Sequence, residues 1–174
     1  MTVKVSGLNE ISRNLERVVN QKLPNAVSRS LNTIARKAMS SATKEVAKDI
    51  GVPQKTIRSR SKITKANKSR QMANIRVIRS NMPAIRLFEN RSNRMWVGRG
   101  AIIVGKYAIK RGFIQRLKTG RTHIMQRRGR ERYSIDVVKI PLARPLTSSY
   151  EKQLDNYPEQ IKTELTKNLM VALK

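Results

Sequence analysis

The sequence contains no cysteine and only one histidine, His123. Disulfide frameworks, thiolate nucleophiles, iron–sulfur clusters and the usual zinc sites are therefore excluded, and so is a histidine-rich metal site. Acidic residues are scarce as well, with 11 Asp and Glu among 174 residues, which leaves few groups for paired-carboxylate catalysis. No apolar run approaches the roughly 20 residues that span a bilayer, and the N-terminus lacks the apolar core of a signal peptide. We therefore expect no enzyme, cofactor, metal site, small-molecule substrate or membrane partner.

What the chain has in excess is positive charge. Its 38 Lys and Arg give a formal net charge of +27 and a pI of about 11.6. Residues 54–132, the basic zone, hold 23 of these cations and only two acids, whereas residues 146–174 are neutral overall. A field of this kind implies a polyanionic partner, either nucleic acid or acidic protein surfaces, and the two do not exclude each other. Sequence-specific DNA binding is not expected, because no groove-reading motif is present and only 4% of residues are aromatic.

Hydrophobic spacing predicts helices over residues 7–60. Leu8, Ile11, Leu15 and Val18 form the apolar stripe of a first helix, and Pro24 fits the first turn of a second helix. The second stripe is rich in alanine and serine and ends at Gly51, a natural helix stop. Two interpretations remain open for this stripe, namely ordinary internal packing or a helix contact between subunits. Its residues are Val27, Leu31, Ile34, Ala35, Ala38, Ala42 and Val46.

The middle of the chain predicts a basic sheet region over residues 73–141. Apolar alternation and turn signals favour strands at 75–78, 84–88, 101–109 and 135–140, together with a hairpin over 113–128 that bends at Thr119-Gly120. The polar segments 61–72 and 89–100 are expected to be loops, which could be disordered outside an assembly. A long C-terminal helix is expected over 146–174. We therefore predict one α+β domain over residues 1–174, with a central antiparallel sheet, N-terminal helices and a C-terminal helix.

Two features look like catalytic motifs and are better explained otherwise. The segment Gly100–Lys106 has the glycines and lysine of a phosphate-binding loop, but Tyr107 follows where Ser or Thr is needed, and its apolar interior favours a strand. His123 lies in a predicted strand without a neighbouring acid or second histidine. A hydrogen-bonded structural or interface role is favoured over a pH-sensitive contact to DNA or a neighbouring subunit. Asp136 is expected to form an ion pair with a nearby arginine.

The residues chosen as candidate contacts fall into two sets. Basic residues and the histidine near the predicted hairpin are candidates for contacting DNA or an acidic partner: Arg121, His123, Arg127, Arg128, Arg130 and Arg132. Apolar residues on one stripe of the C-terminal helix are candidates for assembly contacts: Leu154, Ile161, Leu165 and Leu169.

A long motif in the second half of the chain resembles the lambda-type minor tail protein Z family of tailed bacteriophages. Residues 112–127 read GFIQRLKTGRTHIMQR, and residues 132–141 read RYSIDVVKIP. Ser134 stands where the family pattern has proline, a change that affects backbone stiffness at this point. The similarity is looser upstream, over residues 32–52 and 73–77 and at Leu87 after Pro83, and it extends to Pro145-Leu146-Thr147.

This resemblance implies a structural minor tail protein that completes a long, non-contractile tail at its head-proximal end and helps to position the DNA end. It implies contacts with other tail or neck proteins, such as the tail terminator, tube or tape-measure protein, and a homo-oligomer such as a ring. The expected location is the virion tail, and the host cytoplasm during assembly. Two alternatives remain: a free, non-specific nucleic-acid-binding protein, and an assembly chaperone that is absent from the finished virion.

Overall fold

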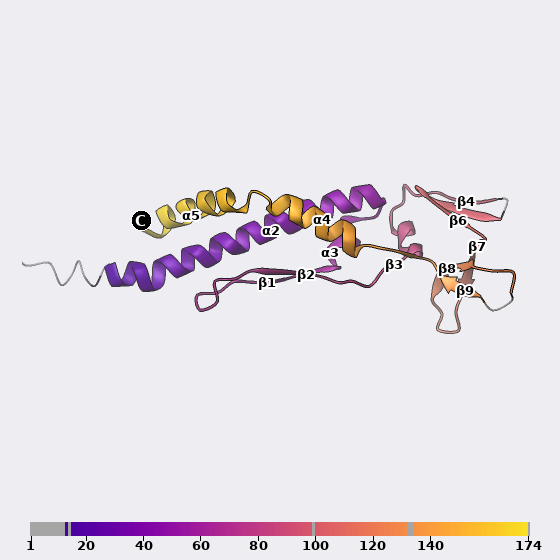
Figure 1. Ribbon diagram of the computed structural model, residues 1–174, viewed down its shortest axis with the longest axis horizontal. Coiled ribbons are helices and arrows are strands. Elements are labelled where there is room, and N and C mark those ends of the chain that lie inside the picture. The colour runs from indigo at the N-terminus through magenta and orange to yellow at the C-terminus, as the bar shows by residue number, and fades with distance from the viewer. Residues whose placement is uncertain (1–12, 14, 99, 132–133, 174) are drawn as a thin grey trace, which may run out of the picture. The chain divides into compact units, whose positions relative to one another are not determined.

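A computed structural model describes residues 13, 15–98, 100–131 and 134–173 of the chain. Helices precede and follow a series of short antiparallel strands along the sequence, so the predicted α+β class is confirmed (Figure 1). The chain forms two compact units. Unit 1 comprises Met1–Met39, Lys62–Arg76 and Gln153–Lys174, and unit 2 comprises Ser40–Ser61 and Val77–Lys152. A single domain over residues 1–174 stays a prediction.

The N-terminal helical region does not break at Pro24. A π-helical segment, η1 (Val18–Lys22), runs directly into the long helix α2 (Leu23–Ile50). The N–H of Leu23 bonds to the carbonyl of Val18, five residues earlier, and Pro24, which has no N–H to donate, follows at once. The prediction of a new helix starting at Pro24 is therefore wrong, because a π turn accommodates the proline. The predicted residues Leu8 and Ile11 lie outside the described residues.

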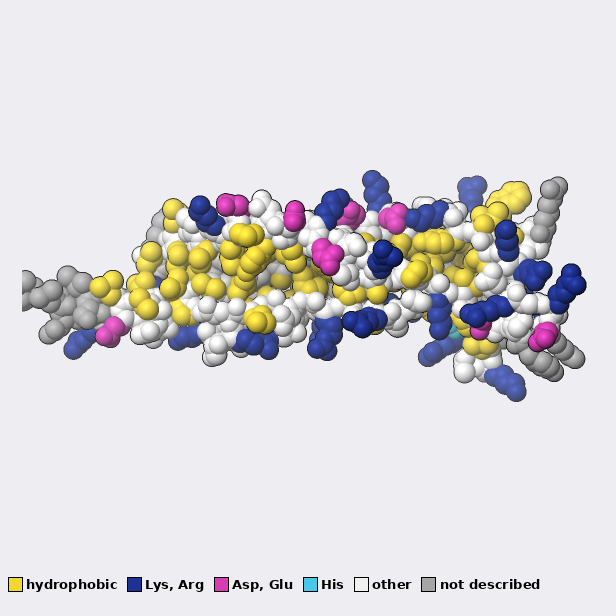
Figure 2. All heavy atoms as spheres, in the orientation of Figure 1, with side chains coloured by type: hydrophobic (Ala, Val, Ile, Leu, Met, Phe, Trp, Pro, Cys, Tyr) yellow, Lys and Arg dark blue, Asp and Glu magenta, His cyan; other side chains and the backbone are white. Residues whose placement is uncertain are grey.

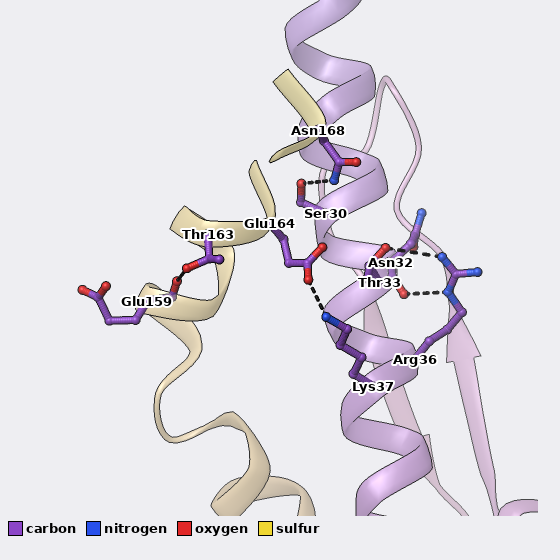
Figure 3. Close-up of polar contacts among 9 residues, drawn as sticks. All are labelled: Ser30, Asn32, Thr33, Arg36, Lys37, Glu159, Thr163, Glu164 and Asn168. Carbon is purple, nitrogen blue, oxygen red and sulfur yellow. Dashed lines mark hydrogen bonds and ion pairs between the residues drawn. The ribbon is translucent and has the colours of Figure 1, made fainter. Parts of the chain in front are cut away.

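Unit 1 contains a pair of helices held together by polar contacts as well as by apolar side chains. Helix α5 (Tyr157–Leu173) lies beside the first part of α2 (Figure 3). Lys37 forms an ion pair with Glu164, and the side-chain amide of Asn168 donates to the Ser30 hydroxyl at 2.8 Å. The predicted stripe of α2 is buried in its middle. In unit 1 its buried apolar residues include Leu31, Ile34, Ala35 and Ala38.

A two-stranded sheet adds to unit 1 and corrects one sequence prediction. Strand β1 (Ser61–Thr64) pairs with β2 (Asn74–Val77), although residues 61–72 were expected to be a loop. The side chain of Asn32 on α2 holds the segment after β1, because it donates to the carbonyl of Ala66 at 2.9 Å and accepts its N–H at 2.8 Å. The pairing is long-range, which explains why the polar sequence of β1 did not reveal it.

Unit 2 is built around the second part of α2. Gly51, with φ at +80°, ends this helix as predicted, and its N–H bonds to the carbonyl of Ala47. Helix α3 (Gln54–Arg58) follows, and α4 (Ala143–Leu154) is tied to α2 by the Ser149 hydroxyl, which donates to Glu45 at 2.8 Å. The large side chains that are fully buried in this unit include Ile57, Met82, Leu87, Ile102, Val104, Ile124, Leu142 and Leu146.

The strands of unit 2 form three small antiparallel sheets. Strand β10 (Lys139–Ile140) pairs with β3 (Met82–Pro83). The second sheet has the order β4 (Met95–Gly98), β5 (Ala101–Val104), β6 (Tyr107–Lys110), and the third has the order β7 (Gly112–Arg116), β8 (Thr122–Arg127), β9 (Ile135–Val137). The predicted hairpin over 113–128 is confirmed. The predicted strand 135–140 is instead two strands, β9 and β10, which pair in different sheets, so the strands that the structure describes form several small sheets and not one central sheet.

Three further details of the predicted strands are wrong. Residues 84–88 belong to a 3₁₀ helix, η2 (Ala84–Glu89), in which Ala84 and Leu87 are both buried, one 3₁₀ turn apart. The predicted loop 89–100 contains β4, and the predicted strand 101–109 is two strands joined at Gly105-Lys106. The C-terminal helix is confirmed but divided between Leu154 and Tyr157, which separates α4 from α5.

The lowered pKa values of Glu89 and Glu164 indicate how the stability of the protein depends on pH. The Lys37 ammonium lowers the pKa of Glu164 below its usual 4.5. At Glu89, burial raises the pKa, but the Thr56 hydroxyl and Arg86 lower it more, so its pKa also ends below 4.5. Carboxyls with a depressed pKa in the folded protein stabilise it above the unfolded pKa, and this contribution is lost as pH falls through the folded value. We expect the urea midpoint to fall as pH drops below 4.5.

The variant Lys37→Ala isolates the Glu164 contribution. Without its ammonium partner the pKa of Glu164 moves back toward its usual value, so the acid-induced loss of stability becomes smaller than in the parent. Urea titrations at several pH values between about 3 and 6 measure this difference. An unchanged dependence on pH would show that the ion pair does not contribute to stability.

Candidate nucleic-acid and assembly surfaces

The structure brings together only part of the predicted basic set. Arg127 ends β8, and Arg128 and Arg130 follow it in the connection to β9, so these three arginines lie close together. Arg121 precedes the opposite end of β8, and at about 3.4 Å per residue it lies roughly 20 Å from Arg127. Arg132 lies outside the described residues. The candidate surface is therefore centred on Arg127, Arg128 and Arg130, which we call the arginine loop.

Ser134 holds the arginine loop in place. Its hydroxyl accepts the N–H of Gly129 at 3.1 Å, and its carbonyl accepts the N–H of Arg128 at 2.9 Å. The same hydroxyl lies 3.4 Å from the carbonyl of Glu131, to which it donates. Proline, the residue of the family pattern, would stiffen the backbone here. In this chain a side-chain hydroxyl limits the movement of the loop through hydrogen bonds instead.

The three arginines of the loop differ in their electrostatic surroundings. Arg128 forms an ion pair with Asp136 on β9, as the sequence predicted. Within the described residues, neither Arg127 nor Arg130 has an acid within ion-pair distance. Both are thus available to an anionic partner, whereas part of the charge of Arg128 is neutralised inside the chain.

His123 lies in β8, opposite Gln115 of β7. Its Nδ1 is buried and has no hydrogen-bond partner among the described residues, so the predicted hydrogen bond is not found at this nitrogen. No group of three His, Cys, Asp or Glu side chains that could hold a metal ion occurs in the described part of the chain. The segment after Gly100 is strand β5, as expected when the phosphate-loop interpretation was rejected.

Sequence reasoning missed a basic cleft in unit 2. The cleft has a volume of about 500 Å³ and combines three cations and one acid with two hydroxyls. Inside it, Glu89 pairs with Arg86 and accepts a hydrogen bond from Thr56, and Arg60 donates to Ser80 at 2.9 Å. The residues come from segments up to 34 positions apart, so no local motif could reveal them. The cleft is lined by Lys55, Thr56, Ser59, Arg60, Ile78, Arg86 and Glu89.

The predicted assembly stripe is half-buried in the chain itself. Glu164 and Asn168, which contact α2, place this face of α5 toward α2 (Figure 3), and Ile161, Leu165 and Leu169 on α5 are only partly accessible. Leu154, which is also half-buried, ends α4 and therefore does not share a helix with the other three. More accessible apolar side chains occur nearby in unit 1, and the sequence analysis did not select them as contacts. They are Leu15, Val19 and Leu23 on the N-terminal helical segment and Met170, Val171 and Leu173 on α5.

Unit 2 carries the larger share of the positive charge. Its residues include 23 Lys and Arg but six Asp and Glu, a net charge of +17. Lysines and arginines are prominent over the strands of this unit in the space-filling view (Figure 2). Among the described residues, no helix is long and apolar enough to cross a membrane.

Comparison with known proteins identifies the family. The family model described as Prophage minor tail protein Z (GPZ) matches residues 5–174. The tail completion protein of Escherichia phage N15 is 35% identical over 163 residues, which cover 90% of this chain and 89% of that protein. Tail completion protein Z of Escherichia phage lambda is 34% identical over 185 aligned positions, covering 98% and 94%. No solved structure matches the chain. With this extent of similarity, the chain belongs to the prophage minor tail protein Z family.

Proposed function

We propose that the chain is a structural tail-completion protein of a long-tailed bacteriophage, that it acts at the head-proximal end of the tail, and that the arginine loop contacts the DNA end. The observation that carries the DNA contact is the availability of Arg127 and Arg130, two cations without an acidic partner among the described residues. Both lie in a unit with a net charge of +17. The family supports the tail-completion role, since both relatives described above are tail completion proteins.

The chemistry of the arginine loop suits a phosphate backbone better than base recognition. Guanidinium groups bind phosphate oxygens through two parallel hydrogen bonds, and such contacts position DNA without reading its sequence. The loop carries no groove-reading helix, and Ser134 limits its movement. DNA binding is therefore expected to be non-specific and strongly dependent on salt. His123, which is partly covered and whose Nδ1 is buried, is a weaker contact candidate.

The same proposal includes assembly contacts made by unit 1. The accessible apolar side chains of α5 and of the N-terminal helical segment are suited to self-association, and residues 146–174, which include α5, carry no net charge that would repel a second copy. We infer a homo-oligomer formed through these helices, with a ring as the arrangement that closes at a tail end. The tail terminator, tube and tape-measure proteins are the partners expected at that place.

The double variant Arg127→Ala/Arg130→Ala tests the DNA contact. Each lost phosphate contact reduces the slope of log affinity against log salt by about 0.9, so the double variant should lose about 1.8 from the parent's slope. Fluorescence anisotropy with a labelled linear duplex measures the slope. In phage, tails completed with this variant should assemble normally but give fewer infectious particles. The matched control is Arg17→Ala/Arg29→Ala, which removes the same charge from exposed positions of unit 1.

Equal salt slopes for the two double variants would contradict a specific role of the arginine loop. Mass spectrometry of purified tails, separated from heads, distinguishes the remaining alternatives. A fixed copy number in tails is expected from the structural role. Absence from particles would favour the assembly chaperone, and DNA binding without any stable tail partner would favour a free nucleic-acid-binding protein.

A further inference from the structure

Strand β4 is unusually exposed for an apolar strand. All four of its residues are exposed, including Trp96 at 73% and Val97 at 66%. Among the described residues the strand pairs with β5 on one side and with no strand on the other, and Val97 lies opposite Ile102, which is 1% exposed. On this face of the sheet, the side chain of Ile102 on β5 is therefore buried by the rest of the protein, whereas that of Val97 on β4 is exposed to solvent. An exposed apolar edge strand is a template for pairing with another chain, and soluble proteins normally protect such an edge.

The register extends this apolar surface across the sheet. Trp96 pairs with Ile103, and Ile103 pairs with Ala108, so the three side chains form a row on one face of the β4–β5–β6 sheet. Trp96 is the only tryptophan of the chain, and Ile103 is 47% exposed. In Figure 2, apolar side chains gather over the region where Figure 1 labels β4 and β6, with Lys and Arg around them. We call this row and the free side of β4 the β4 edge.

The start of β4 is anchored. Two residues before the strand, the amide of Asn93 donates to the carbonyls of Gly51 and Leu87, both at 2.7 Å, and Asn90 donates to Gly51 at 3.0 Å. These bonds join the segment before β4 to the end of α2 and to η2. A strand that is already held in place loses little conformational entropy when a partner pairs with it.

The charges around the β4 edge identify its occupant. Arg91 and Arg94 precede the strand, Lys110 lies on the same face as Ala108, and Arg111 follows it; all four are exposed. A second copy would bring the same cations together across a two-fold contact, which is unfavourable. The DNA backbone could bind the cations, but its charged surface would not cover the apolar row. We propose that the β4 edge binds an extended segment of another tail protein, with apolar side chains for the row and carboxylates for the surrounding cations.

Photocrosslinking in assembled tails tests this proposal, which rests on the proposed tail function. A benzophenone amino acid replaces Trp96, and in a matched control it replaces Met72, an exposed apolar residue of unit 1. We expect position 96 to crosslink to an acidic, apolar segment of a different tail protein, and the control not to do so. A crosslink to a second copy or to DNA, or none at all with the protein present in tails, would overturn the docking proposal alone. Absence of the parent protein and of the Met72 variant from tails would overturn the tail function as well.

Two further variants separate docking from folding and from DNA binding. Trp96→Ala removes the largest exposed anchor, and Val97→Lys adds a charge to the edge without removing buried volume. Each should reduce incorporation into tails by about tenfold, as expected when one anchor of a docking surface is lost. The circular dichroism of both isolated variants, and the DNA affinity of Trp96→Ala, which changes no charge, should equal those of the parent. Normal incorporation of both variants would refute the proposal.

Discussion

Replacing Leu146 with alanine is expected to lower the free energy of unfolding by about 2–5 kcal/mol. Leu146 lies on α4 and is 0% exposed, in a unit whose other fully buried side chains include Leu87 and Leu142. The substitution removes buried methyl groups and leaves a cavity that its surroundings fill only in part. Because domains of this size have total stabilities of about 5–15 kcal/mol, the variant loses a large part of its margin.

Urea titration measures this loss as a lower midpoint at an unchanged slope. Leu173→Ala is the matched control, because the same side chain is shortened at a position of α5 that is 57% exposed. Its effect should stay within about 0.5 kcal/mol. Similar midpoints for the two variants would show that α4 does not pack as the structure describes.

Replacing Gly112 with alanine is expected to cost about 1–3 kcal/mol, because there is no room for a methyl group. An added Cβ would lie 2.8 Å from Cγ2 of Ile109 and 2.9 Å from its carbonyl oxygen. The side chain of Ile109 is buried, and the carbonyl belongs to the backbone, so neither can move without disturbing the junction of β6 and β7. The loss therefore arises from the close approach of Gly112 to Ile109 within the tight connection between β6 and β7.

Gly98→Ala is the matched control for this second prediction. Gly98 also lies in a strand, but a Cβ there would meet no atom within 4 Å. Thermal or urea unfolding should place Gly98→Ala near the parent and Gly112→Ala clearly below it. If the two glycine variants were equally stable, the close contact with Ile109 would be refuted.

Local patterns revealed much of this fold. The alanine-rich stripe of α2 repeats at helical spacing, and Gly51 supplies the left-handed conformation that ends the helix. The hairpin of β7 and β8 was predictable because its bend and both strands are adjacent in sequence. Asp136 was matched to an arginine because acids are rare in this region, and Arg128 proved to be its partner.

Other features did not follow from local patterns. Strand β1 pairs with β2 across a loop. Strand β4 pairs with β5, which begins just after it in the sequence, but the polar and basic residues before β4 made its segment look like a loop. In η2 the same apolar residues fit a strand or a 3₁₀ turn, and burial of Ala84 and Leu87 decides between them. The basic cleft brings Lys55, Arg60 and Arg86 together only after folding. The spacing of these residues in the sequence does not indicate that their side chains line the same cleft.

Arg111 shows how this chain combines backbone geometry with charge. It is the residue other than glycine with a positive φ among the described residues, at 53°, a conformation that costs an L-residue on the order of 1 kcal/mol. Its N–H bonds to the carbonyl of Gly100, and its carbonyl accepts the N–H of Arg127, so its backbone links the two three-stranded sheets. An Arg111→Gly substitution would relieve the backbone strain but would remove one cation from this surface. Backbone stability and positive charge therefore favour different residues at this position.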